Sequence, residues 1–409
     1  MAPLVLLAVL AQAPERVTFV FGGDIIPHDP VKTVARLHNV VTDAGVSLNS
    51  DGWDHVFGPL QPVFVRSDFA VVNLETPIVT VKKPERGEMV FHGAPVLLDA
   101  LKKAGVAVAS FANNHCLDQH REGITATRDF LRTAGLLAVG CDVNEEAAWT
   151  PLVLEKNGLR VGILSLTRFI NGFNNTQDPA EPHVPAVGYP KEPKIIGDHS
   201  IEQLLETVKA RSAEVDALVV FIHWGDEYKV KPRDEDRALA QQLLDAGAFA
   251  IVGHHPHVLQ PVEWFTRADG TKGLVAFSLG NLVSNQDFDK EAGLKRDGLL
   301  LELELSRAAK GAPVQVTKVA GVPVFTENRM AGGGKKRNVQ PLLLEDELAA
   351  MQARVLELEG RVDKAAKAER KTLAHRIGIA TARLGRIQAA MAGAFTEAAP
   401  AASMAAPAK

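Results

Sequence analysis

The hydrophobic residues between positions 16 and 320 fall into short, separated runs. Several runs are rich in β-branched and aromatic residues, and they read VTFVFGG, FAVVNLE, VAVASFANN, RVGILSL, ALVVFIHWG, AFAIVGHH and GLVAFSLGN. Such runs predict buried β-strands. Between several of them, the amphipathic pattern of helices covers residues 95–104, 122–134, 201–213 and 235–246. Strands that alternate with helices predict an α/β fold built of packed layers.

The last apolar runs, 274–283, 298–305 and 313–320, follow one another without helical stretches between them. This order predicts a β-meander, which we expect to complete a second sheet.

Polar residues follow the ends of most of the predicted strands. They are Asp24, Glu75, Asn113, Asn114, His115, His223, His254, His255, His257 and Asn281. Ligands of α/β proteins gather where strands end and loops begin, so we expect sheet topology to bring these side chains to one edge. The densest cluster is IVGHHPH at 251–257, which holds three of the chain's 13 histidines.

These residue types suit a divalent metal. Carboxylate and amide oxygens with imidazoles favour Zn²⁺, Mn²⁺, Fe or Mg²⁺ over a thiolate site. The candidates outnumber the ligands that one ion needs, so we predict two divalent ions bridged by a carboxylate. Ions about 3.5–4 Å apart clamp a tetrahedral centre and activate a nucleophile. In an extended segment, the i, i+2 spacing would turn His255 and His257 to the same face.

Each residue alone also has a purely structural explanation. A strand-end aspartate such as Asp24 commonly caps a turn. Asn113, Asn114 and His115 could form a turn, and His223 could be a core histidine. Packing seldom requires three clustered histidines, however, and the recurrence of such residues at successive strand ends favours the metal site.

Composition and charge narrow the function further. The chain has 46% hydrophobic and 23% charged residues and a net charge of −4, which is typical of a globular protein. It has no basic stripe interleaved with aromatics, so we expect no nucleic-acid partner. After the N-terminus it has no apolar run of membrane-spanning length, so we expect at most a peripheral membrane contact.

The N-terminus and the cysteines bear on the compartment. Residues 1–13 combine an apolar stretch with Ala11-Gln12-Ala13, which predicts a signal peptide and a periplasmic, secreted or cell-envelope location. A first β-strand is the alternative. Cys116 and Cys141 lack C-x-x-C spacing, and they could form one disulfide or remain two thiols.

Six motifs together resemble the CapA family, the bacterial capsule or poly-γ-glutamate synthesis proteins. They are FGGDIIPHD, VVNLETPI, SFANNHCLDQHREGI, VVFIHWGDEY, IVGHHPHVLQPVE and AFSLGNLV. The family is related to the calcineurin-like metallophosphoesterases. The resemblance implies a layered, metallophosphoesterase-like β-sandwich flanked by helices over residues 14–325, although a shared fold does not by itself set the reaction.

The resemblance also implies roles for individual residues. The implied metal ligands are Asp24, Glu75, Asn114, His223, His255 and His257, with Glu75 as the bridging carboxylate. His115 corresponds to the catalytic histidine. Three further residues would either orient the metal ligands or act as additional ligands, namely His28, His254 and Asn113. His28 and His120 stand where relatives carry other residues, which bears on the substrate more than on metal binding.

Residues 166–190 form a long segment rich in Asn and Pro, of the kind that often closes over a binding site. We expect Arg168, Asn171 and Asn174 to face substrate, with Arg168 pairing a carboxylate or phosphate. Glu227, Tyr228 and Asn281 are expected to line the same cleft. A solvated surface loop is the alternative.

The C-terminal residues have a different pattern. Residues 326–340, which include RMAGGGKKRN, predict a flexible linker. Residues 341–395 predict a helical arm, because two series of apolar residues have heptad spacing: Leu344, Leu348, Met351, Val355, Leu358 and Val362, then Leu373, Ile377, Ala380, Leu384, Ile387 and Met391. One long helix that forms a coiled-coil homodimer and a helical hairpin are both consistent with this spacing. Residues 396–409 predict a disordered tail.

Three hypotheses for function follow. The first is a metal-dependent hydrolase that acts on an anionic capsule or cell-envelope polymer, with His115 as general acid. The second is a phosphoesterase with a small phosphate-bearing substrate. The third is a non-catalytic envelope subunit that binds polymer at the metal site and assembles through its arm.

Overall fold

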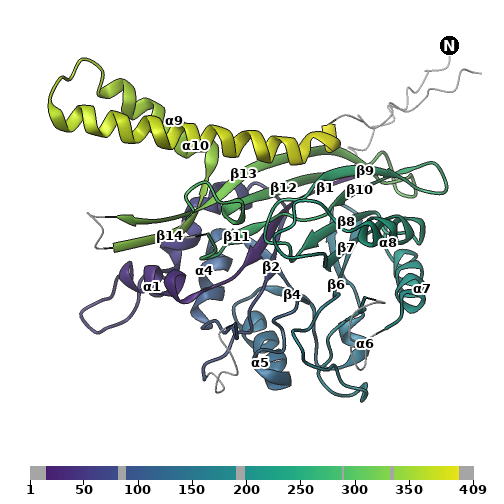
Figure 1. Ribbon diagram of the computed structural model, residues 1–409. Helices are drawn as coiled ribbons and strands as arrows, with labels where there is room; N and C mark the ends of the chain where they lie inside the picture. The colour runs from purple at the N-terminus through teal and green to yellow at the C-terminus, as the bar shows by residue number, and fades with distance from the viewer. Residues whose placement is uncertain (1–14, 82–88, 190–198, 288–289, 332–335, 396–409) are drawn as a thin grey trace, which may run out of the picture.

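Two β-sheets pack face to face, and helices cover their outer faces (Figure 1). The computed structural model describes residues 15–81, 89–189, 199–287, 290–331 and 336–395. The predicted signal peptide and C-terminal tail lie outside these residues. None of the described helices combines the length and apolar character needed to cross a bilayer.

The first sheet has eight strands in the order β14-β13-β12-β1-β2-β3-β4, and β11 also pairs with β1. Their bounds are β1 Glu15–Ile25, β2 Phe69–Leu74, β3 Val106–Phe111, β4 Leu137–Gly140, β11 Asn281–Val283, β12 Asp297–Arg307, β13 Gln315–Ala331 and β14 Lys336–Leu343. Strands β1 to β4 run parallel, and β12 to β14 are antiparallel.

The second sheet has six strands in the order β5-β6-β7-β8-β10-β9. Their bounds are β5 Leu152–Lys156, β6 Leu159–Thr167, β7 Ala217–His223, β8 Ala250–His254, β9 Val262–Thr266 and β10 Lys272–Ala276. Strands β6, β7, β8 and β10 run parallel. The carboxyl ends of β6, β7 and β8 therefore lie at one edge of this sheet.

The α-helices have the bounds α1 Asp29–Leu37, α2 Trp53–Phe57, α3 Gln61–Phe64, α4 Val96–Ala104, α5 His120–Thr133, α6 Glu145–Ala148, α7 Ile201–Ser212, α8 Asp234–Asp245, α9 Leu344–Glu357 and α10 Lys364–Phe395. Helices α4, α5, α7 and α8 begin and end close to the four predicted helical stretches, whereas α1, α2, α3 and α6 were not predicted. Helices α1 to α4 pack on the eight-stranded sheet and α7 and α8 on the six-stranded sheet. The layered α/β sandwich flanked by helices is thus confirmed.

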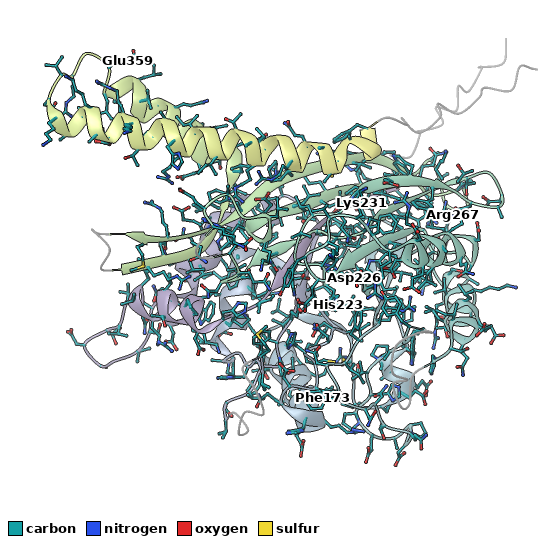
Figure 2. All side chains as sticks on the ribbon, viewed as in Figure 1. Phe173, His223, Asp226, Lys231, Arg267 and Glu359 are labelled. Carbon is teal, nitrogen blue, oxygen red and sulfur yellow. The ribbon has the colours of Figure 1, made fainter. Side chains whose placement is uncertain are left out.

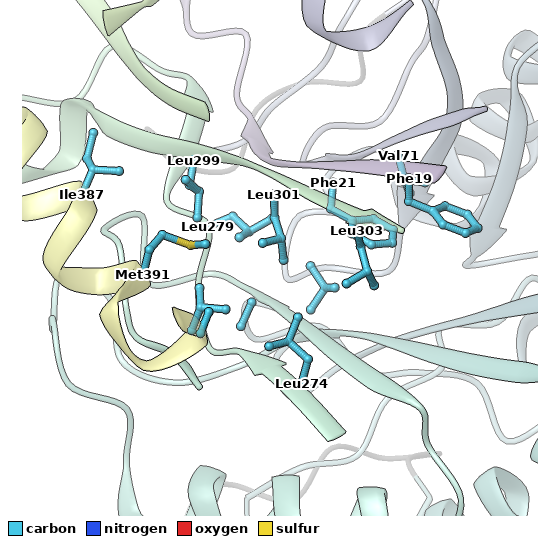
Figure 3. Packing of buried hydrophobic residues seen from close by; sticks show 14 of the residues in the cluster. Phe19, Phe21, Val71, Leu274, Leu279, Leu299, Leu301, Leu303, Ile387 and Met391 are labelled. Carbon is cyan, nitrogen blue, oxygen red and sulfur yellow. The ribbon is translucent and has the colours of Figure 1, made fainter. Parts of the chain in front are cut away.

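The C-terminal arm is a hairpin that covers the sandwich. Helix α10 lies across one end of the sheets in Figure 1, with α9 alongside it. Ile387 and Met391 belong to the same buried cluster as Phe21, Leu299 and Leu301 between the sheets (Figure 3). Because α9 ends at Glu357 and α10 begins at Lys364, the helical hairpin is the alternative that the structure contains, and the one long helix is wrong. The apolar face of α10 packs on the sheets of the same chain.

Two other predictions need correction. The expected flexible linker 326–340 lies largely in β13 and β14, which pair antiparallel from Val324↔Leu343 onward. Arg296 holds the start of this segment, because it donates to the Thr326 carbonyl and lies 3.6 Å from the Glu327 carboxylate. The expected meander is divided, because β10 joins the six-stranded sheet whereas β12 and β13 extend the eight-stranded one.

Candidate metal centre

The predicted ligands converge where the carboxyl ends of β1, β2, β3, β7 and β8 meet. Asp24 lies near the end of β1, Glu75 follows β2, and Asn114 lies in the turn after β3. His223 ends β7, and His255 follows β8. Figure 2 shows His223 in the interior of the molecule below the arm. Parallel strands explain this convergence, because the carboxyl ends of β1 to β3 share one edge of the first sheet, those of β7 and β8 share one edge of the second, and the two edges meet at the ligands.

Two groups of buried side chains could each hold a metal ion, and both include Glu75. One is Asp24, Glu75 and His223, and the other is Glu75, His255 and His257. Within each group the ligand atoms lie within 4.8 Å of one another. Glu75 Oε1 is 3.5 Å from His223 Nε2 and 3.8 Å from His257 Nε2. A carboxylate shared by two ligand sets is the arrangement expected of a bridging ligand.

Asn114 joins this constellation through His223. The Asn114 Oδ1 atom lies 2.8 Å from His223 Nε2, and His255 Nδ1 lies 3.1 Å from the same nitrogen. Asp24 Oδ2 contacts His257 Nδ1 at 3.1 Å. All six predicted ligands therefore lie in one connected cluster.

The His-His-Pro-His segment reaches the centre as a turn and not as an extended strand. His255 and His257 both have positive φ, at 98° and 57°, which is rare for residues other than glycine and costs conformational energy. The expectation that i, i+2 spacing in an extended segment aligns the two rings is therefore wrong. Gly253, in β8 just before the histidines, allows the strand to approach the Phe277 backbone, because a Cβ there would lie 2.0 Å from the Phe277 carbonyl oxygen.

Two buried polar atoms at the centre have no hydrogen-bond partner in the described part of the chain, namely Glu75 Oε1 and His223 Nδ1. A buried polar atom without a partner costs free energy. Burial raises the pKa of Glu75 well above its usual value, and the charge of Asp24 raises it further. A divalent cation would compensate this carboxylate, so the residues present fit a metal.

The imidazoles of the centre are poised as neutral ligands. Burial, with the neighbouring His255, holds the pKa of His223 well below its usual value. Burial, with His257, lowers the pKa of His255 to about 3. Burial acts to raise the pKa of Asp24, but the hydrogen bonds from His257 and Asn73, together with the charges of His254 and His257, lower that pKa below its usual value. Neutral imidazole and ionised carboxylate are the forms that bind metals.

His115 stands beside the ligands and is oriented by a carboxylate. Its Nδ1 lies 2.8 Å from Asp118 Oδ2, and the Phe91 amide donates to that same oxygen at 2.6 Å. The Phe91 ring packs against the His115 ring at 4.2 Å between centroids. Asn171 lies 3.4 Å from both ring nitrogens and accepts from the Asn114 amide at 3.1 Å. Asn171 therefore lies beside His115, and its predicted contact with substrate stays a prediction.

The three residues that we expected to orient the ligands or to act as additional ligands each make a different set of contacts. His254 Nε2 donates to the Gly22 carbonyl at 3.2 Å, so it braces β1. Asn113 donates to the Leu74 carbonyl and to Asn73, and its oxygen accepts from the His115 amide. His28 Nδ1 accepts from the Asn285 amide, and burial lowers its pKa to about 4.

The substrate-facing predictions are only partly consistent with the structure. Arg168 is buried, and its guanidinium donates to the carbonyls of Val187 and Gly188 and lies 3.9 Å from Asp236. Arg168 therefore supports the loop from a buried position, because its Nε and Nη2 donate to loop carbonyls and its Nη1 lies near Asp236. Asn174 is exposed in a surface hollow with His120 and Phe173, and the lining of this hollow includes none of the six predicted ligands.

The remaining expected cleft residues surround His257. The centre of the Tyr228 ring lies 6.0 Å from that of the His257 ring. The charge of Glu227 also raises the pKa of Glu75, with a smaller effect than burial or the charge of Asp24. Asn281 is buried and donates to the His257 carbonyl at 3.3 Å and the Lys295 carbonyl at 2.8 Å. Asn281 therefore holds the histidine turn, whereas Glu227 and Tyr228 lie at the exposed rim.

Sequence reasoning missed Asn73, Asp118 and Phe169 as parts of the centre. Asn73 donates to Asp24 Oδ1 at 2.8 Å. Its position as the one amide residue inside an apolar strand could have indicated this role. Asp118 follows His115 by three residues, a spacing that allows contact within a turn. Phe169 packs on the His255 ring at 4.6 Å, and nothing in its local sequence indicated this.

Cys116 and Cys141 are buried free thiols in the structure. Cys116 Sγ donates to the Asn113 carbonyl at 2.9 Å, directly beside the His115 turn. Of the two alternatives that the sequence left open, the structure contains the pair of thiols.

The fold and the site define a two-sheet α/β protein with a candidate metal centre at the carboxyl ends of its parallel strands. Comparison with known families identifies it further. Residues 18–286 match the model of the bacterial capsule synthesis protein PGA_cap family, and the chain belongs to this family.

Individual relatives agree with this assignment. The capsule biosynthesis protein CapA of Bacillus anthracis is 29% identical over 296 residues, which is 71% of this chain and 64% of that protein. The PGA biosynthesis protein CapA of Bacillus subtilis (strain 168) is 31% identical over 281 residues, covering 67% of this chain and 68% of that protein. The chain thus spans about two thirds of the length of these relatives.

Solved structures show a more distant likeness. The NAD nucleotidase of Haemophilus influenzae has 10% sequence identity and a TM-score of 0.45, over 90% of this chain and 61% of that one. A hypothetical protein from Thermus thermophilus has 16% identity and a TM-score of 0.40, over 75% of this chain and 98% of that one.

Proposed function

We propose that this protein is a metal-dependent hydrolase that acts on an anionic cell-envelope polymer during capsule synthesis. Membership of the capsule synthesis family supports the process, and the names of the Bacillus relatives support a poly-γ-glutamate capsule. The observation that carries the hydrolase assignment is the buried Glu75, which belongs to two ligand groups at once.

The residues of the centre would hold two divalent ions. Asp24, His223 and Asn114 would bind one, His255 and His257 the other, and Glu75 would bridge them. When bound, such a pair supplies Lewis-acid polarisation of a phosphoryl or acyl oxygen. The mixed oxygen and imidazole donors suit Mn²⁺, Zn²⁺, Fe or Mg²⁺.

His115 would move the proton in the reaction. Asp118 accepts the Nδ1 proton of His115, which leaves Nε2 to donate a proton to the departing atom of the substrate. The carboxylate also stabilises the positive charge of the protonated ring. Phe91 and Asn171 fix the ring position, so the proton donor stays beside the ligand cluster.

An extracytoplasmic location belongs to the same proposal. Its support is the A-x-A pattern after an apolar stretch in residues 1–13 and the capsule function named for the relatives. Cell fractionation with an N-terminal sequence of the mature protein tests it, and a cytoplasmic protein that retains residues 1–13 would contradict it.

The test of the function compares turnover with metal content. We expect the metal-loaded wild type to hydrolyse poly-γ-glutamate or bis(p-nitrophenyl) phosphate, and His115→Ala to lose ~10²–10⁴-fold in kcat. His115→Ala should keep the wild-type metal content, whereas His255→Ala/His257→Ala should lose both metal and turnover. A metal-loaded wild type that binds the polymer but turns over neither substrate would favour a non-catalytic polymer-binding subunit.

A further inference from the structure

His28 lies beside the candidate metal centre and belongs to neither of its two ligand groups. It follows the ligand Asp24 by four residues and directly precedes α1. Its ring makes a T-shaped contact with the Phe91 ring, with 5.2 Å between the ring centroids, and the Phe91 ring also packs on the His115 ring. His28 and His115 therefore share one aromatic neighbour at the edge of the centre.

The electrostatic surroundings of His28 agree with this position. Burial, followed by the charges of His257 and His115, lowers the pKa of His28 to about 4. Interactions between charges weaken with distance, so His28 lies near both a predicted ligand and the predicted proton donor. The His28 ring is therefore uncharged at neutral pH.

A backbone hydrogen bond fixes which nitrogen of the His28 ring carries the proton. The Asn285 amide donates to His28 Nδ1 at 3.1 Å. A backbone amide can only donate, so Nδ1 is unprotonated and the neutral ring carries its proton on Nε2. Asn285 is held in turn by Asn328 of β13, whose side-chain amide donates to the Asn285 carbonyl at 3.4 Å. The fold thus sets the tautomer of His28.

The Nε2–H group of His28 has no hydrogen-bond partner among the residues that the structure describes, where the ring is bonded to the Asn285 amide alone. The Ile26 carbonyl accepts from the His28 backbone amide at 2.8 Å, and it has the smallest of the effects on the pKa of the ring. His28 is partly exposed. Its Nε2–H group is therefore a donor that a ligand at the centre can use.

The bond from Asn285 also disfavours His28 as an additional metal ligand. A metal ion needs the lone pair of a neutral ring nitrogen. The Nδ1 lone pair accepts from the Asn285 amide, and Nε2 carries the proton. A metal ion on Nε2 would move that proton to Nδ1, where it would face the Asn285 N–H group and break the bond.

His28 and His115 thus differ in the partner of Nδ1. The Asp118 carboxylate lies 2.8 Å from His115 Nδ1 and stabilises a protonated, positively charged ring. The N–H donor on His28 Nδ1 stabilises only the neutral ring. A neutral imidazole donates a hydrogen bond without giving up its proton, and such a ring can polarise a substrate oxygen. His115 is therefore suited to proton transfer and His28 to hydrogen bonding.

We propose that His28 is a catalytic hydrogen-bond donor whose Nε2–H group binds a substrate oxygen that gains negative charge at the metal centre. The inference rests on the proposed function and adds a second histidine to it. His28 keeps its proton throughout, and His115 supplies the proton for the departing atom. A fixed donor at a developing oxyanion is worth ~10²–10³-fold in kcat.

The first test is turnover of bis(p-nitrophenyl) phosphate by the metal-loaded full chain. We expect His28→Ala to lower kcat ~10²–10³-fold with little change in KM and with wild-type metal content. His28→Gln should recover most of the loss, because its side-chain amide can place an N–H group near the position of Nε2. His38→Ala, at the exposed opposite end of α1, is the matched control and should change nothing.

Two outcomes of this test would overturn the assignment. Loss of metal from His28→Ala would make His28 a ligand. Equal losses of kcat in His28→Gln and His28→Ala would show that a donor at this position does not matter. A merely structural role would also lower the activity of His38→Ala or fail to distinguish the two His28 variants.

The tautomer can be measured without turnover. Nitrogen NMR of the zinc-loaded full chain, labelled with ¹⁵N-histidine, reports which ring nitrogen carries the proton, and His28→Gln identifies the His28 signals. We expect a neutral ring protonated on Nε2 at pH 7. A ring protonated on Nδ1, or on both nitrogens, would overturn the inference.

Failure of the proposed function would have a different signature. The wild type would then turn over no substrate, yet the donor could still be tested by titration calorimetry of inorganic phosphate with the zinc-loaded chain. We expect His28→Ala to weaken phosphate binding ~10–100-fold, as for loss of a hydrogen bond to a charged group, and His28→Gln to bind nearly as the wild type does. No phosphate binding by the wild type, or equal affinities in the wild type and His28→Ala, would overturn the inference.

Discussion

Two regions of this molecule bury charged and polar side chains, which have partners within the chain in one region and lack some of them in the other. Where the arm meets the sheets, Asp297 is buried between Arg383 and Arg386, and Arg383 also donates to the Glu291 carbonyl. At the strand ends, Glu75 Oε1 and His223 Nδ1 are buried without hydrogen-bond partners in the described chain.

This difference distinguishes buried charges that stabilise the fold from buried charges that could bind a ligand. Buried ions that hold a fold together are paired within it, because an unpaired one costs several kcal/mol. Glu75 Oε1, which lacks a hydrogen-bond partner in the described chain and lies among the other ligand atoms, is better explained by a partner from outside the chain. The predictions that follow test this distinction.

The largest effect is expected at the arm. Asp297→Ala leaves Arg383 buried without its carboxylate, which should lower the free energy of unfolding by ~3–5 kcal/mol in urea titrations. Arg354→Ala is the matched control, since Arg354 pairs with Glu369 on the exposed face of the arm and should cost at most ~1 kcal/mol. Similar losses in both variants would remove the distinction between buried and exposed pairs.

A pH effect comes next, at Asp236. This carboxyl accepts from the Tyr189 hydroxyl, and burial raises its pKa from 3.8 to about 6. A raised pKa in the folded state means that its contribution to stability is complete below pH ~4 and is lost as the pH rises to ~6. The loss is ~3 kcal/mol for about two pKa units.

Asp236→Asn removes this titration. The difference in unfolding free energy between the variant and the wild type should therefore change by ~3 kcal/mol between pH 4 and pH 7, in favour of the variant at the higher pH. Urea titrations across that range measure it. A difference that does not vary with pH would show that Asp236 titrates normally in the folded protein.

The smallest effect is expected beside the ligands. Asp118→Asn should lower turnover ~10–100-fold, because it loosens the orientation of His115 without removing a metal ligand. Metal content should stay at the wild-type level, and kcat should fall more than KM changes. If the variant instead loses its metal, Asp118 supports the ligand cluster as a whole and not His115 specifically.

The strand-end residues were predictable from sequence, because an apolar run indicates a buried strand and the polar residue that follows it must lie where that strand ends. The run VVNLE, for example, places Glu75 at a sheet edge from the amino-acid pattern alone. The arm was not predictable in the same way. Its heptad stripe shows that a face is buried but not what covers it, and here Leu299 and Leu301 of the same chain do so.

Polar composition misled two other predictions for a related reason. Residues 326–340 look like a linker because they include three consecutive glycines among charged and amide residues, yet Arg296 and Arg376 contact the buried Glu327 and the strands pair around it. Arg168 lies in a polar loop, but its partners are backbone carbonyls more than 15 residues away in the chain, at Val187 and Gly188. Long-range partners of this kind leave no local signal.

The most direct test of the account is the metal stoichiometry of the wild type and of Glu75→Gln, by elemental analysis after loading with Mn²⁺ or Zn²⁺ and removal of free metal. We predict about two ions per wild-type chain, and one or none in Glu75→Gln, because the amide cannot serve as the shared carboxylate. Equal metal content in the two proteins, or none in either, would contradict a metal centre built around Glu75.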